Sequence, residues 1–251
     1  MTLGPLIHWV EIIERASRVS IQSPIRVVPL TAAPTQPVAR VRSLELPFKY
    51  ELQPLMHVVS GDTYGYELLY RGDPTVSWKH VDRQILDHLV RHKGHTPRMF
   101  VNLSNETLLE QPFELIIEAA SNNDVIFEVS EAMVDAQQLP VLTERINTLI
   151  ASGVRFAIDD FGNGMDGMMR FYSLAGCKSV KFDGAFLKVA CQRPDAVRVL
   201  RSLVKMWKEF DIVTIAEWIE NAEMLAFAVD LGVDLVQGWH IDSLVAKQRS
   251  A

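Results

Sequence analysis

The chain has 251 residues, of which 48% are hydrophobic and 22% charged, and its formal net charge is −6. This ordinary globular composition excludes collagen-like, coiled-coil and largely disordered proteins, and the acidic balance argues against a binder of DNA or anionic membranes. No apolar run reaches the roughly 18 to 20 residues that a membrane helix needs, and the start lacks the basic region of a secretory signal. We therefore expect a cytoplasmic protein without a membrane span.

Residues 1–46 differ from the rest of the chain. Apolar residues recur at helical spacing between Pro5 and Arg18, which predicts a short amphipathic helix, and prolines then crowd the stretch 20–46. Because proline removes backbone donors that helices and sheets use, we interpret 1–46 as an N-terminal extension and linker, partly disordered. It would tether the chain or dock an unidentified protein partner; the alternative is a tail without such a role.

From 47 to 251, short β-rich runs alternate with helical stretches, as expected of one domain. The predicted strands are 49–58, 63–70, 98–103, 125–129, 154–159, 179–182, 212–216 and 234–238. The predicted helices are 78–92, 105–121, 139–152, 165–174, 192–210 and 221–231. This alternation predicts an α/β fold of the (β/α)8 type. The loop 60–62 is too short for a parallel crossover, so the first strand should run antiparallel, giving a modified TIM-type barrel.

Polar side chains stand at the carboxyl ends of these strands, where the active sites of such barrels lie. A single carboxylate there is usually a helix cap, but five or more cannot all be caps. Packed acids in a partly dry mouth repel one another unless they take up protons or bind cations. An all-oxygen set suits Mg²⁺ or Mn²⁺ better than zinc or copper. The candidate oxygen ligands are Glu67, Asn102, Glu128, Asp159 and Asp160.

The adjacent pair Asp159 and Asp160 is the most informative part of this pattern. If both side chains turn toward the mouth, one carboxylate can bridge two metal ions while the other holds the second. The alternative is that Asp160 caps the following helix and only Asp159 takes part. Gly162 and Gly164 permit a tight, mobile loop directly after the pair.

Several segments resemble, in order, the EAL family of cyclic di-GMP phosphodiesterases. They are Gln53-Pro54 and the stretches 66–71, 101–104, 127–131, 158–164, 180–183, 216–220 and 237–239. The resemblance covers about 48–240. It implies a metal-dependent hydrolase of bacterial signalling that converts cyclic di-GMP to linear pGpG. It also implies two Mg²⁺ or Mn²⁺ ions per site and a homodimer.

Carried over residue by residue, the resemblance assigns metal ligands and catalytic groups. The ligands would be Glu67, Asn102, Glu128 and Asp159 for one ion, and Asp159 and Asp160 for the other. Lys181 would hold and help activate the attacking water, Glu217 would accept its proton or order metal-bound water, and Gln237 would support that water or the second ion. For Lys181, a Schiff-base nucleophile and a purely structural ion pair remain as alternatives.

The resemblance also implies a substrate pocket and an anchored loop. Arg71 would clamp a substrate phosphate, since its planar fork suits a phosphodiester. Gln53 and Asp183 would line the nucleotide pocket. Glu131 and Glu220 would anchor the loop that follows Asp160.

Some positions depart from the family pattern and leave a second interpretation open. Trp218 stands where the family usually has glycine, the stretch between Arg71 and Val81 is short, and 242–244 replaces the usual Ser-Arg-Pro. The chain would then be a catalytically silent EAL module, acting as a cyclic di-GMP receptor or a protein-binding adaptor. The intact ligand set favours the enzyme. A metal-dependent lyase or enolase-like barrel uses similar oxygens but not this order of motifs.

Overall fold

The computed structural model describes residues 44–94, 97–129, 137–164, 167–174 and 176–250. The predicted helix between Pro5 and Arg18 and most of the predicted linker lie outside the described residues. Leu44, which belongs to the predicted extension, is buried and packs into the core. Its backbone N–H donates to the hydroxyl of Tyr50, which in turn donates to the Leu44 carbonyl. The packed domain therefore includes residues at least from Leu44 onward.

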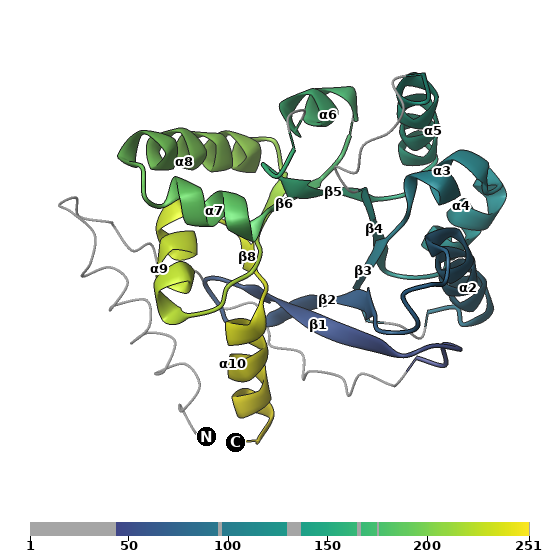
Figure 1. Ribbon diagram of the computed structural model, residues 1–251, viewed down its shortest axis with the longest axis horizontal. Coiled ribbons are helices and arrows are strands. Elements are labelled where there is room, and N and C mark those ends of the chain that lie inside the picture. Colours follow the sequence, from purple (N-terminus) through teal and green to yellow (C-terminus); the bar gives the residue numbers. More distant parts are fainter. Residues whose placement is uncertain (1–43, 95–96, 130–136, 165–166, 175, 251) are drawn as a thin grey trace.

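The strands close into a barrel in sequence order, β1 to β8, as predicted (Figure 1). β1 pairs antiparallel with both β2 and β8, and the other neighbours pair in parallel. The modified TIM-type barrel with one reversed strand is thus confirmed. The strands are β1 Tyr50–His57, β2 Thr63–Tyr70, β3 Met99–Asn102, β4 Val125–Val129, β5 Phe156–Phe161, β6 Ser179–Phe182, β7 Val213–Ala216 and β8 Leu235–Val236.

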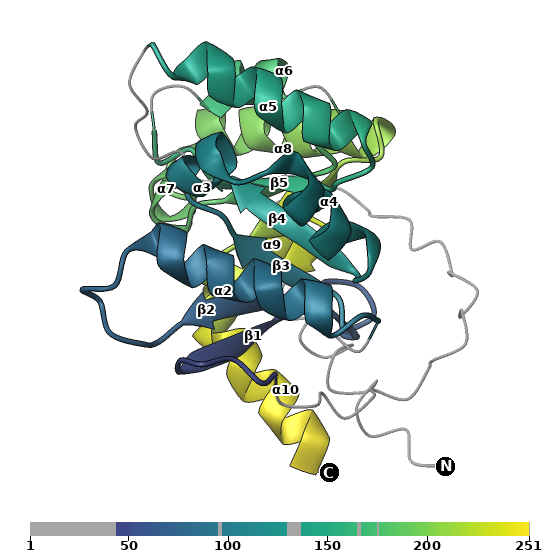
Figure 2. The same cartoon turned by 90° about the vertical axis from the view of Figure 1, so that its right-hand side faces the viewer.

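Helices surround this ring, and α10 packs on β1, extending below it in Figure 2. Their bounds are α2 Trp78–Arg91, α3 Asn105–Glu110, α4 Phe113–Ser121, α5 Leu139–Ala151, α6 Gly167–Ser173, α7 Gly184–Ala190, α8 Pro194–Glu209, α9 Ala222–Leu231 and α10 Trp239–Ser250. Two predictions are corrected. The single helix predicted over 105–121 is two helices, because Pro112 forces Gln111 into extended backbone and then begins α4. The helices α7 and α10 were not predicted.

The barrel interior has an apolar floor and a polar mouth, built from the same strands. Side chains two positions apart on a strand face the same side. Six strands each carry a buried apolar residue, and the residue two positions nearer the mouth is one of the predicted site residues. The pairs are Leu55 with Gln53, Phe100 with Asn102, Ile126 with Glu128, Ala157 with Asp159, Ile215 with Glu217 and Leu235 with Gln237. Strand alternation therefore delivers polar groups to one layer above a packed floor.

Candidate active site

Lys181 on β6 stands at the centre of the polar layer, with its side chain completely buried. Its Nζ lies 2.7 Å from Oε1 of Glu128 and 2.8 Å from both Oδ1 of Asp159 and Oε1 of Glu217. Oε2 of Glu67 is 3.1 Å away. An ammonium group has only three N–H donors, so it cannot satisfy four carboxylates at once. The four acids therefore have the capacity to bind further cations.

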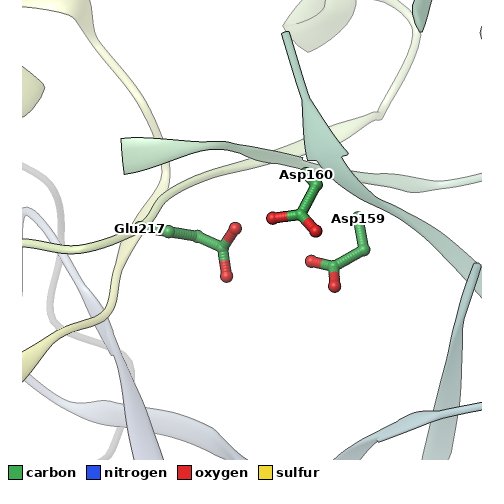
Figure 3. Close-up of side chains that lie close together, drawn as sticks. All are labelled: Asp159, Asp160 and Glu217. Carbon is green, nitrogen blue, oxygen red and sulfur yellow. The ribbon is translucent and has the colours of Figure 1, made fainter. Parts of the chain in front are cut away.

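A bulge in β5 turns both adjacent aspartates toward the mouth. Ile158 pairs with Val180 and Phe161 with Phe182, so β5 carries one residue more than β6 between these two pairs. Bulges of this kind re-aim side chains, and here Asp160 takes a left-handed φ of 53°. As a result, carboxylate oxygens of Asp159, Asp160 and Glu217 lie within 4.8 Å of one another, and the three groups point into the same space (Figure 3).

Two amide side chains connect the acids of the layer. The Asn102 amide nitrogen donates to Oε1 of Glu67 and to Oε2 of Glu128, both at 3.0 Å. Gln237 Nε2 donates to Oε2 of Glu67 at 2.5 Å. These hydrogen bonds hold Asn102 and Gln237 in the same layer as the acids around Lys181.

A chain of hydrogen bonds leads from Glu67 out to α10. Gln237 Nε2 also donates to Oε1 of Gln53 at 2.9 Å, and Gln53 Nε2 donates to Oδ2 of Asp242 at 3.0 Å. Oε1 of Gln237 is buried and accepts no hydrogen bond from any residue that the structure describes. It is therefore an acceptor held ready for a water, a cation or a ligand.

Burial and mutual repulsion shift the pKa values of the acids. Burial, and then the nearby charge of Glu67, raises the pKa of Glu128 well above the ordinary range. Burial also raises the pKa of Glu217 well above that range, although Lys181 acts to lower it. Burial also raises the pKa of Asp159, and burial with the charge of Asp159 raises the pKa of Asp160 to about 6. The protons that these acids take up occupy oxygens that a cation would otherwise bind.

Glu67 and Lys181 are the charged pair at this centre. Burial acts to raise the pKa of Glu67, but Lys181 and the Gln237 amide outweigh it and lower the pKa. Burial acts to lower the pKa of Lys181, but the surrounding carboxylates, Asp159 first, raise it well above its ordinary value. A Schiff-base nucleophile requires a neutral amine, so the environment of Lys181 disfavours that alternative.

A cavity of about 350 Å³ opens above this layer. Arg71 lies on its rim, half exposed, with Nε 2.9 Å from Oε2 of Glu51. Glu220 also lines the cavity and accepts from Lys188 at 2.9 Å. The lining residues are Gln53, Glu67, Leu69, Arg71, Asp159, Asp160, Glu217, Trp218, Glu220, Gln237, Gly238 and Trp239.

The predicted pocket residue Asp183 is not among the residues that line this cavity. Asp183 is buried and caps α7, its Oδ1 accepting from the Phe186 N–H at 2.7 Å, so its carboxylate serves the helix end. Glu131 lies outside the described residues. Sequence reasoning missed Asp242 as a partner of Gln53, because the helix that carries it was not predicted. The available signal was the replaced family motif at 242–244.

The chain matches the family model "EAL domain" over residues 74–243. It belongs to the EAL-domain family. The match begins after β2, so Gln53, Glu67 and Arg71 precede the matched segment, and only the closed barrel brings them to the mouth.

Curated relatives carry names from the same family. The chain is 24% identical over 175 residues to "Cyclic di-GMP phosphodiesterase PdeF" of Escherichia coli, covering 64% of this chain and 23% of that protein. It is 30% identical over 176 residues to "Probable cyclic di-GMP phosphodiesterase PdeA" of the same organism, with the same 64% and 23% coverage. The chain thus spans 23% of the length of these relatives.

Solved structures share the fold. BlrP1 of Klebsiella pneumoniae, described as a calcium and cyclic di-GMP complex, has a TM-score of 0.63 at 20% identity, covering 77% of this chain and 54% of that one. The EAL domain of FimX from Pseudomonas aeruginosa, bound to cyclic di-GMP, has a TM-score of 0.58 at 21% identity, covering 76% and 88%. No helix among the described residues is long and apolar enough to span a membrane.

Proposed function

We propose that this protein is a metal-dependent phosphodiesterase that hydrolyses cyclic di-GMP to linear pGpG. The observation that carries the proposal is the ring of acids around buried Lys181 at the barrel mouth. The names of the curated relatives and the ligand in the related structures support the choice of substrate.

The residues present fit a pair of divalent ions. Five carboxylates face one ammonium, so full ionisation leaves four negative charges without compensation, which is the charge of two Mg²⁺ or Mn²⁺ ions. The orphaned Oε1 of Gln237 offers one more oxygen. The first ion would be held by Glu67, Asn102, Glu128 and Asp159, and the second by Asp159 and Asp160. When bound, such ions neutralise the diester and lower the pKa of a water molecule toward neutrality.

The protein's own groups would then perform the hydrolysis. Arg71 would bind a non-bridging phosphate oxygen, exchanging its exposed pair with Glu51 for the substrate. With cations taking over part of the carboxylate oxygens around it, Lys181 would have an N–H donor available for the attacking water. Glu217 would accept the proton of that water as its oxygen bonds to phosphorus. The bond between phosphorus and the 3′ oxygen would break, and the released 3′ oxygen would take a proton from solvent. Gln237 Oε1 would accept a hydrogen bond from the same water.

A second candidate function is a cyclic di-GMP receptor without turnover. One observation favours it: Trp218, directly after Glu217, has a left-handed φ of 54° and lines the cavity. A bulky ring at this position can hold Glu217 away from its productive geometry. In that case the acids would bind metal and nucleotide, but no water would be activated.

We further propose that the enzyme works as a homodimer in the cytoplasm. Exposed apolar side chains on α5 and α6 offer a face for a second copy; they are Leu139, Val141, Met169 and Tyr172. Sedimentation at micromolar concentration tests this proposal. A monomer at all concentrations would contradict it.

The decisive test of function is direct. The purified chain is incubated with cyclic di-GMP and Mg²⁺ or Mn²⁺, and the products are separated by chromatography. Metal-dependent appearance of pGpG is expected. Tight binding of cyclic di-GMP without any product, across both metals, would identify the receptor.

A further inference from the structure

Trp218 has a backbone conformation that few large side chains adopt. Among the residues that the structure describes, the non-glycine residues with positive φ are Asp160, Asp211 and Trp218, the last at 54°. A bulky L-residue in this region is strained, and such strain persists only where the surroundings hold it. Here the backbone is tied on both sides, because Glu217 N–H donates to the Phe182 carbonyl and Ile219 N–H donates to the Gln237 carbonyl.

The side chain of Trp218 is seated on α7 at the cavity wall. A Cβ atom on Gly184 would lie 2.1 Å from the Trp218 Cβ, so this approach requires glycine at the start of α7. Lys188, one turn along, places Nζ 5.7 Å from the ring centre and is held there by Glu220 at 2.9 Å. The indole is thus fixed by α7 and by a cation over its ring.

Despite these supports, the indole does not contribute to the packed core. Trp218 is 53% exposed, and it borders the cavity whose floor is formed by the acid cluster. Exposing half of a large aromatic side chain forgoes the free energy that its burial would give. The fixed ring therefore leaves an exposed apolar surface at the edge of the cavity, where a bound ligand can reach it.

We propose that Trp218 is a specificity-determining residue that stacks on a purine base of the nucleotide substrate. The proposal rests on the proposed function, because cyclic di-GMP supplies the base. Aromatic side chains bind bases through their π-faces, and the ring lies on the same cavity wall as Glu217 and Glu220. The alternative is that the ring merely obstructs the cavity. In that case, removing the ring should strengthen nucleotide binding instead of weakening it.

Three substitutions separate the ring from the backbone strain. Trp218→Phe keeps both an aromatic ring and the strain, Trp218→Ala keeps only the strain, and Trp218→Gly removes both. Affinity for cyclic di-GMP is measured by calorimetry with calcium, the ion named with a related complex. Thermal unfolding and the affinity for Mn²⁺ alone are measured in parallel. Phe210→Ala removes an aromatic side chain that is 63% exposed and does not line the cavity, and serves as the matched control.

Stacking predicts that affinity follows the ring. Both Trp218→Ala and Trp218→Gly should weaken cyclic di-GMP binding by roughly 5- to 150-fold, while Trp218→Phe stays close to wild type. Trp218→Gly should melt above Trp218→Ala, since glycine relieves the strain, and Mn²⁺ affinity and the Phe210→Ala variant should match wild type. Unchanged or tighter nucleotide binding by Trp218→Gly would overturn the stacking proposal alone. A wild-type chain that binds no cyclic di-GMP would overturn it together with the proposed function.

Discussion

At the scale of single residues, Asp242 on α10 sets the direction of the hydrogen bonds that two amides at the mouth, Gln53 and Gln237, make. The Asp242 carboxylate can only accept, so Gln53 must turn Nε2 toward it and Oε1 inward. Gln237 must then donate from Nε2 to both Gln53 and Glu67, which leaves Oε1 of Gln237 as the open acceptor. One acid on α10 thereby orients two amides of the site.

Asp242→Asn should weaken catalysis by allowing these amides to reverse. We expect kcat/KM for cyclic di-GMP to fall roughly 10-fold or more, as for a lost hydrogen bond to a charged group. The thermal transition should stay near that of wild type, because Asn retains the shape of the side chain. Ser243→Ala, the next residue along, is the control. Equal kcat/KM for Asp242→Asn and wild type would show that Asp242 does not orient the amides for catalysis.

Glu67→Ala tests the ligand set. We expect metal-dependent turnover to fall by at least about 100-fold, since even outer partners of metal ligands change activity 10- to 100-fold. Circular dichroism should remain that of the folded barrel. The control is Glu118→Ala, which removes an exposed carboxylate paired with Lys93. Wild-type turnover by Glu67→Ala would contradict the role assigned to Glu67.

Stability should depend on pH in opposite ways with and without metal. The pKa values of Asp160, Glu128 and Glu217 are raised on folding, to about 6 for Asp160, so the folded state binds more protons than the unfolded state. Their contribution therefore destabilises the metal-free protein as pH rises from about 4 through 6 and beyond. Bound cations replace those protons and reverse the trend.

The expected observation is a metal-induced rise in Tm that grows between pH 5 and pH 8. At a hundredfold excess of Mn²⁺ over its Kd, the rise should reach roughly 5 to 10 °C at the upper pH. Subtracting the Tm measured without metal from the Tm measured with metal cancels the effect of groups that titrate elsewhere in the chain. A rise that is larger at pH 5 than at pH 8 would show that the acids are not the ligands.

At the scale of elements, the alternation of strands and helices predicted the barrel because each strand carries its own apolar signal. The short loop 60–62 likewise predicted the reversed β1. The sequence did not reveal the β5 bulge, because an extra residue in one strand is defined only by its partner. It also did not reveal α7, whose seven residues are too few to show a clear period. The break before Pro112 was visible in the sequence as a proline, but the prediction extended one helix across it.

For the site, strand alternation predicted which acids share a layer but not which of them caps a helix. Alternation with a period of two placed Glu128, Asp159 and Glu217 in one layer, since each lies two positions beyond a floor residue. Asp183 lies two positions beyond the inward-facing Lys181, so the same alternation would place it at the mouth, but its carboxylate caps α7. Which acid faces the mouth and which faces a helix end depends on packing between elements.

The close fit of α7 against the end of β7 gives a prediction at this scale. Gly184→Ala places a Cβ 2.1 Å from the Trp218 Cβ, so it should destabilise the fold by about 1 to 3 kcal/mol. In the Trp218→Gly background the three atoms nearest to that Cβ are removed, so the same substitution should cost clearly less. Equal losses in the two backgrounds, measured by urea unfolding, would show that the contact is not tight.

At the scale of the whole molecule, the boundary of the packed domain can be tested by truncation. Removal of 1–43 should leave a folded and active chain, because the described core begins at Leu44. Removal of 1–46 also deletes Leu44 and its bonds to Tyr50, and should lower the unfolding free energy by about 2 kcal/mol. Insoluble protein after removal of 1–43 would show that the extension belongs to the fold.

Catalysis as proposed requires acids from separate strands to act together with two cations at the barrel mouth. Titration of Mn²⁺ into the purified chain with cyclic di-GMP, followed by quantification of pGpG, tests this most directly. We expect no product without metal, and turnover that saturates as the ions bind. Product formation that is independent of metal, or saturable metal binding that yields no product, would contradict this expectation.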